Sequence, residues 1–286
     1  MEIVGGTGKK GKEEDGNVVW VWWRSVEEWG TLIEEWVAET GQKGSVLTLY
    51  ELTESDATVG QGQSLNNNYG PNQANQTGRI SVHTNFVADF YGTDGLAITS
   101  VGSNYNPSQP YVNRDPRLLA SVYLPGLTYF FGAYTGHAGN ASIETDFAVR
   151  KYTYADLTTV DRGLDVIVLR YADILLMLAE AENEVNGPTT IAYSAINEVR
   201  SRVKMPNVTA GLLAPAFKVE VLHERRVELG FEGQRWFDLV TLGIADAKIN
   251  GIKELGRKFV PGKQELFPIP KSEIDLNNNL EQNTGY

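Results

Sequence analysis

The stretch FKVEVLHERRVELGFEGQRWFDLVTLG, residues 217–243, determines how the rest of the chain is interpreted. Its first half has the spacing of one buried helix face, marked by Phe217, Val221, Leu222 and Leu229. Pro215 precedes this helix, where proline is tolerated, and Gly230 follows the last periodic residue, as a C′ glycine does. The second half predicts a short helix that ends at Gly243 and carries Trp236, Phe237, Leu239 and Val240.

Charged residues cluster in the same stretch. Arg225 follows Leu222 by three residues and precedes Leu229 by four, so it projects into the apolar face. A guanidinium there keeps its charge and must be met by carboxylates. We therefore expect a partly buried, structural ion network that fixes how two helices cross, formed by Glu224, Arg225, Arg226, Glu228, Glu232, Arg235 and Asp238.

Two chemical interpretations of this cluster are weaker. His223 and Glu224 begin like the zinc-binding HExxH motif, but Val227 occupies the second ligand position. Glu232 and Asp238 could supply the acid and base of a glycosidase, although any two carboxylates could be nominated in that way. We therefore expect no catalytic residue, no metal site and no cofactor.

The stretch resembles the signature of the SusD/RagB family, written approximately as ERR-x-EL-x-FEG-x-RW-x-DL-x-R-x-G. Thr241 stands where the family often has arginine, and the positions that match run from Glu224 to Gly243. The resemblance extends to TDG at residues 93–95, NRDPRL at 113–118, RYADILLMLAEA at 170–181 and LFPIP at 266–270. Residues 45–286 therefore resemble the C-terminal region of the family.

This resemblance implies a function and a location. Members of the family are surface lipoproteins of Bacteroidetes that capture glycans or other nutrients beside a SusC-like TonB-dependent outer-membrane transporter, and in them the motif is structural. The resemblance thus implies a binding protein of the outer-membrane surface, not an enzyme, with an oligosaccharide or other nutrient as ligand. A glycoside hydrolase with a carboxylate pair and a helical-repeat scaffold that binds only protein are the alternatives.

Composition restricts the possible partners. The net charge of -11 argues against nucleic acid, whose binding depends on basic residues. The chain has no cysteine, and no apolar run reaches the ~18 residues of a membrane span. The N-terminal residues contain neither an export signal nor a lipobox, so the resemblance implies that signal and anchor belong to a longer protein.

Residues 1–44 match the family poorly, and we interpret them as a remnant of its N-terminal half. Residues 1–16 have the composition of a disordered segment. A helix is predicted over 25–40, because Ser25 and Glu28 form a capping box ahead of an apolar stripe that includes Trp29 and Trp36.

The remainder predicts a mainly α fold, in which tetratricopeptide-like helical hairpins pack with an irregular, loop-rich region containing short β-strands. Residues 170–204 carry two helices, separated by a stop signal at Asn186, Gly187 and Pro188. The first helix is apolar nearly all round, which predicts complete burial. Short strands are expected at 45–52, in the segment after Arg117, and over FAVRKYTY at 147–154, with Phe147 and Val149 pointing inward.

Aromatic and polar residues mix in the loops at 60–75, 100–112 and 128–140, whereas later aromatic residues follow core periodicity. Aromatic rings beside amides and glycines on loops are plausible contacts for a sugar. We therefore predict that any glycan is bound before residue 140, through Tyr69, Tyr105, Tyr129 and Tyr134.

Overall fold

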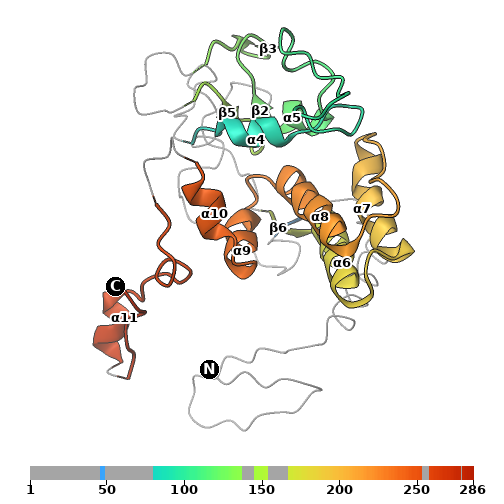
Figure 1. Cartoon of the computed structure of the whole chain (residues 1–286). Coiled ribbons are helices and arrows are strands. Elements are labelled where there is room, and N and C mark those ends of the chain that lie inside the picture. The colour runs from blue at the N-terminus through green and yellow to red at the C-terminus, as the bar shows by residue number, and fades with distance from the viewer. Residues whose placement is uncertain (1–45, 49–79, 137–144, 154–166, 253–257, 278) are drawn as a thin grey trace. The chain divides into compact units, whose positions relative to one another are not determined.

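The structure is a computed structural model that describes residues 46–48, 80–136, 145–153, 167–252, 258–277 and 279–286. The predicted disordered start, the predicted helix at 25–40 and the loop with Tyr69 lie outside these residues. The chain divides into two compact units between Glu224 and Arg225, and each is described by itself. The described part is mainly α-helical, with a few short strands and no closed sheet, as predicted (Figure 1).

A helical hairpin forms one side of the first unit. It consists of α6 (Tyr171–Asn186) and α7 (Thr190–Arg202). Gly187 ends α6 with a positive φ of 79°, and the Thr189 side chain caps α7 by accepting from the backbone N–H of Ala192. The predicted stop signal and the predicted tetratricopeptide-like hairpin are therefore confirmed.

Helix α8 (Ala214–Glu228) adds a third layer to this hairpin. Phe217 is completely buried, and its ring packs edge-on against Tyr193 of α7 with centroids 4.7 Å apart. One hydrophobic core joins the three helices, formed by Leu175, Leu176, Ala179, Ala192, Ala195, Ile196, Val199, Val208, Phe217 and Val221. Phe217 and Val221 of the apolar face predicted for α8 thus pack on the hairpin, whereas Leu222 of that face is only partly buried.

Helix α6 is not buried all round, and this prediction is wrong. Met177 and Leu178 are each 41% exposed, and Val185 is 79% exposed. The described helices cover only the face of α6 that carries Leu175, Leu176 and Ala179. The apolar composition of α6 therefore led to an overestimate of its burial, because the described helices cover only one of its faces.

The loop-rich region of the same unit contains α4 (Thr84–Asp89), α5 (Pro116–Ser121) and short antiparallel strand pairs. Strand β2 (Val122–Tyr123) pairs with β5 (Ala148–Val149), and β3 (Thr128–Tyr129) pairs with β4 (Gly132–Ala133). Strand β1 (Val46–Thr48) pairs with β6 (Ile167–Arg170), with an irregular register between Leu47 and Thr48. The strand predicted at 45–52 is thus present at least over β1.

Two details of this region differ from prediction. The segment after Asp115 begins with helix α5 in place of a strand, because Asp115 accepts the N–H of Arg117 as an N-cap and Pro116 occupies the first turn. In β5 both Ala148 and Val149 are buried, whereas Phe147 is only partly buried, so the strand does not alternate.

The second unit contains the end of α8, α9 (Gln234–Thr241), α10 (Ala245–Asn250) and α11 (Lys271–Leu276). Its core consists of Leu239, Ala245 and Phe259. The left-handed residue after α8 is Phe231, with a φ of 70°, and not the predicted Gly230; Gly243 has a φ of 64° after α9. No described helix combines the length and apolar character that crossing a membrane requires.

Candidate functional site

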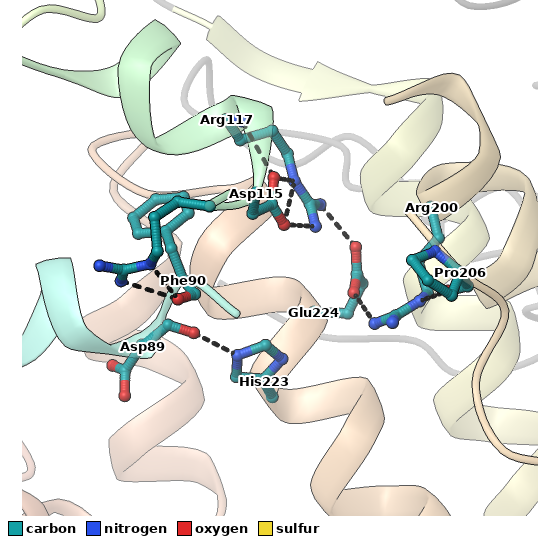
Figure 2. Close-up of polar contacts among 9 residues, drawn as sticks. Asp89, Phe90, Asp115, Arg117, Arg200, Pro206, His223 and Glu224 are labelled. Atoms are coloured by element: carbon teal, nitrogen blue, oxygen red, sulfur yellow. Dashed lines mark hydrogen bonds and ion pairs between the residues drawn. The ribbon is translucent and has the colours of Figure 1, made fainter. Parts of the chain in front are cut away.

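A buried ion network centred on Glu224 lies in the first unit (Figure 2). The Glu224 side chain is completely buried, and each of its oxygens accepts from a different arginine. Oε1 accepts from Nη1 of Arg117 at 2.5 Å, and Oε2 accepts from Nη1 of Arg200 at 2.9 Å. One carboxylate on α8 therefore joins α5 and α7.

The two arginines are held by further acceptors. Asp115 pairs with the Arg117 guanidinium at 2.7 Å while also capping α5, and Arg200 Nε donates to the carbonyl oxygen of Pro206 at 2.6 Å. A carboxylate paired with two guanidiniums in this way crosslinks the packed elements, and loss of either partner would leave a buried charge unpaired.

A second ion pair lies in the second unit. Arg225 is 5% exposed and donates through Nη2 to Asp238 Oδ1 at 2.9 Å, which links α8 to α9. The predicted pairing of Arg225 with a nearby carboxylate is thus present. Glu224, which was an equal candidate for Arg225, faces Arg117 and Arg200 in the structure. The roles predicted for Arg226, Glu228, Glu232 and Arg235 stay predictions.

Sequence reasoning missed Arg117 and Arg200 as partners in the network. One signal pointed to Glu224: Phe217, Val221 and Glu224 follow one helical face at intervals of four and three residues, so Glu224 continues the buried stripe. The partners were not visible, because Arg117 lies 107 residues away from Glu224 in the chain.

A loop that carries two tyrosines lies before α5. Asp94 fixes its start: Oδ1 accepts the N–H of Leu96 at 3.0 Å, and Oδ2 accepts the N–H of Asn104 at 2.5 Å. The Asn104 side chain donates in turn to Thr93 Oγ1 at 3.0 Å. Gly95 takes a φ of 81°, so the TDG turn expected from the family resemblance is present.

Tyr105 and Tyr111 on this loop form the surface that we call the Tyr105–Tyr111 surface. Both rings are partly buried, and neither hydroxyl has a hydrogen-bond partner in the described part of the chain. The Arg114 guanidinium lies over the Tyr105 ring, 5.5 Å from its centroid. Burial, followed by the electrostatic effect of Tyr129 and Tyr105, raises the pKa of Tyr111. Sequence reasoning missed Tyr111.

Two further predicted tyrosines, Tyr129 and Tyr134, lie in β3 and directly after β4. Tyr134 is completely buried in a cluster with Tyr123 and Ala148, so its ring offers no face for a sugar, and the structure does not support it as a contact. The Tyr129 ring is partly buried against Arg150 and Phe131, and its hydroxyl accepts the N–H of Leu124 at 2.8 Å. Ligand contact by Tyr129 or Tyr69 stays a prediction.

Tyr91 stacks on His223 with ring centroids 3.8 Å apart, and its pKa leads to a prediction about stability at alkaline pH. Burial, followed by the charge of Glu220, raises the pKa of Tyr91 from 10.0 to about 12. Above pH 10 the unfolded chain releases this proton first, so stability is lost as the pH rises toward 12. We expect Tyr91→Phe to lose less stability than the original chain over this interval, measured by urea unfolding at each pH. An equally steep loss in both proteins would contradict the assignment.

The hairpin with α8 stacked on it, together with a loop-borne aromatic surface, defines a helix-rich class of protein with a tetratricopeptide-like core. Residues 49–286 match the family model described as the SusD family. The chain belongs to this family.

Three proteins resemble the chain in sequence or in fold. SusD-like protein P2 of Formosa agariphila is 27% identical over 228 residues, which cover 76% of this chain and 41% of P2. A SusD-like protein from Bacteroides fragilis NCTC 9343 superposes with a TM-score of 0.60 and 23% identity, over 78% of this chain and 50% of that one. A SusD-like carbohydrate-binding protein from the same strain superposes with a TM-score of 0.54 and 26% identity, over 69% of this chain and 47% of that one. The chain thus spans half or less of the length of these relatives.

Residues 3–65 match a second family model, described as an ESCRT-II complex subunit. The vacuolar protein-sorting-associated protein 25 of Schizosaccharomyces pombe is 46% identical over 43 residues, which are 15% of this chain and 25% of that protein. This likeness covers a minor part of the chain and does not show membership. The interpretation of residues 1–44 as a remnant of the SusD-family N-terminal half stays a prediction.

Proposed function

We propose that this chain binds a glycan, with the Tyr105–Tyr111 surface as a contact region. The observation that carries the proposal is a pair of half-buried tyrosines on a loop fixed by Asp94, with both hydroxyls lacking a partner in the described part of the chain. A tyrosine supplies an apolar ring and a hydroxyl that donates and accepts, which suits a sugar. The carbohydrate-binding relative from Bacteroides fragilis supports the same ligand class.

Binding without catalysis is the second part of the proposal. A glycosidase requires two carboxyl groups that flank the scissile bond and are free to act on it. In this chain Asp238, one member of the nominated pair, is held by Arg225, and Glu224 is enclosed by two arginines. Release of reducing sugar from laminarin, soluble starch, xylan or pectin would favour the hydrolase alternative.

The proposals for a transporter partner and for the location of the protein are based on its family membership. We propose that the complete protein is lipid-anchored at the outer-membrane surface and delivers its ligand to a SusC-like TonB-dependent transporter. Stacked helices provide a docking face without chemistry, so this role needs no active site. The test is purification of a complete, lipidated version from a Bacteroidetes outer membrane. Recovery without a TonB-dependent partner would contradict the proposal.

The ligand surface is tested by alanine substitution. We expect Tyr105→Ala and Tyr111→Ala each to weaken glycan binding by on the order of tenfold, since a buried aromatic contact of ~1.4 kcal/mol corresponds to that factor. The measurement is retardation in affinity gels containing laminarin, soluble starch, xylan or pectin, with melting temperature as the folding check.

Val101→Ala is the matched control. Val101 lies on the same loop but is fully exposed, so its replacement should change neither retardation nor melting. If both tyrosine variants are retarded as strongly as the original chain, the ligand does not bind at this surface. Protein-only binding, with no retardation by any polymer on the panel, would favour the scaffold alternative.

A further inference from the structure

Arg114 is a buried cation that the ion network does not include. It is 6% exposed, and within the described part of the chain its guanidinium donates to backbone carbonyl oxygens. Nε and Nη2 donate to Phe90 at 3.1 and 2.8 Å, Nη2 also donates to Val87 at 2.5 Å, and Nη1 donates to Pro110 at 2.9 Å. A buried guanidinium that uses all three of its nitrogens occupies a site shaped for it.

These acceptors belong to two separate parts of the first unit. Val87 and Phe90 lie at the C-terminal end of α4, where carbonyl groups lack helical partners and favour a positive charge. Pro110 belongs to the tyrosine loop and directly precedes Tyr111. Arg114 therefore ties the loop to the end of α4.

The backbone around Arg114 is held by hydrogen bonds with residues 91–93. Gly92 and Arg114 form an antiparallel bridge, Thr93 donates to the carbonyl of Asn113 at 2.9 Å, and Asp115 donates to the carbonyl of Tyr91 at 2.8 Å. These hydrogen bonds fix the backbone of Arg114, so its guanidinium has little freedom to follow a movement of the tyrosines.

The same guanidinium lies over the Tyr105 ring at 5.5 Å. One buried side chain consequently contacts the Tyr105 ring and the Pro110 carbonyl, which directly precedes Tyr111. Val101 on the same loop is fully exposed.

We infer that Arg114 is the positioning residue of the Tyr105–Tyr111 surface, holding both tyrosines in the arrangement that binds glycan before the glycan arrives. The inference rests on the proposed function. A surface ordered in advance loses less conformational entropy on binding, so its affinity is higher. Lysine cannot replace the arginine, because an ammonium is a point charge and cannot reach Phe90, Val87 and Pro110 together.

The test is a double-mutant cycle on binding, read by affinity gels with the same four polymers. We expect Arg114→Lys alone to weaken binding roughly five- to tenfold, a range that a lost cation–π contact and loop restraint cover. In a Tyr105→Ala background the same substitution should have a clearly smaller effect, because part of its action runs through the missing ring. An equal effect in both backgrounds, or none in the original chain, would overturn the inference.

Arg117→Lys is the matched control. It changes a buried arginine three residues away that contacts Asp115 and Glu224, so it should lower the melting temperature without a comparable loss of binding. If Tyr105→Ala and Tyr111→Ala leave binding unchanged, the proposed function fails. If they weaken binding while Arg114→Lys does not, only the inference about Arg114 fails.

A measurement on the unaltered chain keeps the inference testable if Arg114→Lys does not fold. Hydrogen exchange at the amides of residues 105–113 should be slow without polymer and change little when the retarding polymer is added. A loop that gains protection only with the polymer would show that Arg114 does not order it in advance, and would overturn the inference.

Discussion

Glu224→Gln is expected to destabilise the first unit by about 3–5 kcal/mol, the usual cost of removing one partner from a buried ion pair. Glutamine keeps the shape of the side chain but removes the charge that neutralises Arg117 and Arg200. Arg117 retains Asp115, whereas Arg200 keeps only the Pro206 carbonyl among its described acceptors. The buried charge on Arg200 therefore causes most of the loss.

The measurement is thermal and urea unfolding of both proteins at neutral pH, where we expect the melting temperature to fall by on the order of 10 °C. Glu184→Gln is the matched control, because Glu184 pairs with Lys218 at the surface and is 52% exposed. Such exposed pairs contribute ~0–1 kcal/mol. Similar losses from both substitutions would mean that the Glu224 network does not stabilise the packing of α5, α7 and α8.

Phe217→Ala is expected to cost about 3–5 kcal/mol through a different mechanism, the cavity left in a packed core. Phe217 is completely buried, and its ring fills the space between α8 and the hairpin, edge-on to Tyr193. Val219→Ala on the same helix is the control, since Val219 is 62% exposed and should change stability by ~0.5 kcal/mol or less. Equal losses from the two variants would place the core of this unit elsewhere.

Features that depend on residues close together in the sequence were predictable. The hairpin of α6 and α7, the stop at Gly187 and the TDG turn follow from residues close in sequence, whose spacing reports the local backbone period. Family membership was predictable for the same reason, because many matching positions fall within the single stretch at 217–243. Boundaries were less certain: Phe231, not Gly230, is the left-handed residue after α8.

Details of exposure were not predictable from the same patterns. Tyr105 and Tyr134 both stand in loops that are rich in glycine or polar residues, yet one is partly exposed and the other is completely buried. Periodicity shows that residues share a face but not whether another segment covers it. For that reason the apolar surface of α6 was predicted to be buried although Val185 is exposed.

The sequence by itself determined the family and the mainly α fold, and it predicted that Arg225 pairs with a nearby carboxylate, because a buried guanidinium cannot lose its charge. Tertiary structure alone decided that Glu224 pairs with Arg117 and Arg200, and that the Arg114 guanidinium lies over the Tyr105 ring. Pairing at such range depends on where loops bring distant residues, and nothing in the spacing of a charged residue identifies which opposite charge it will meet.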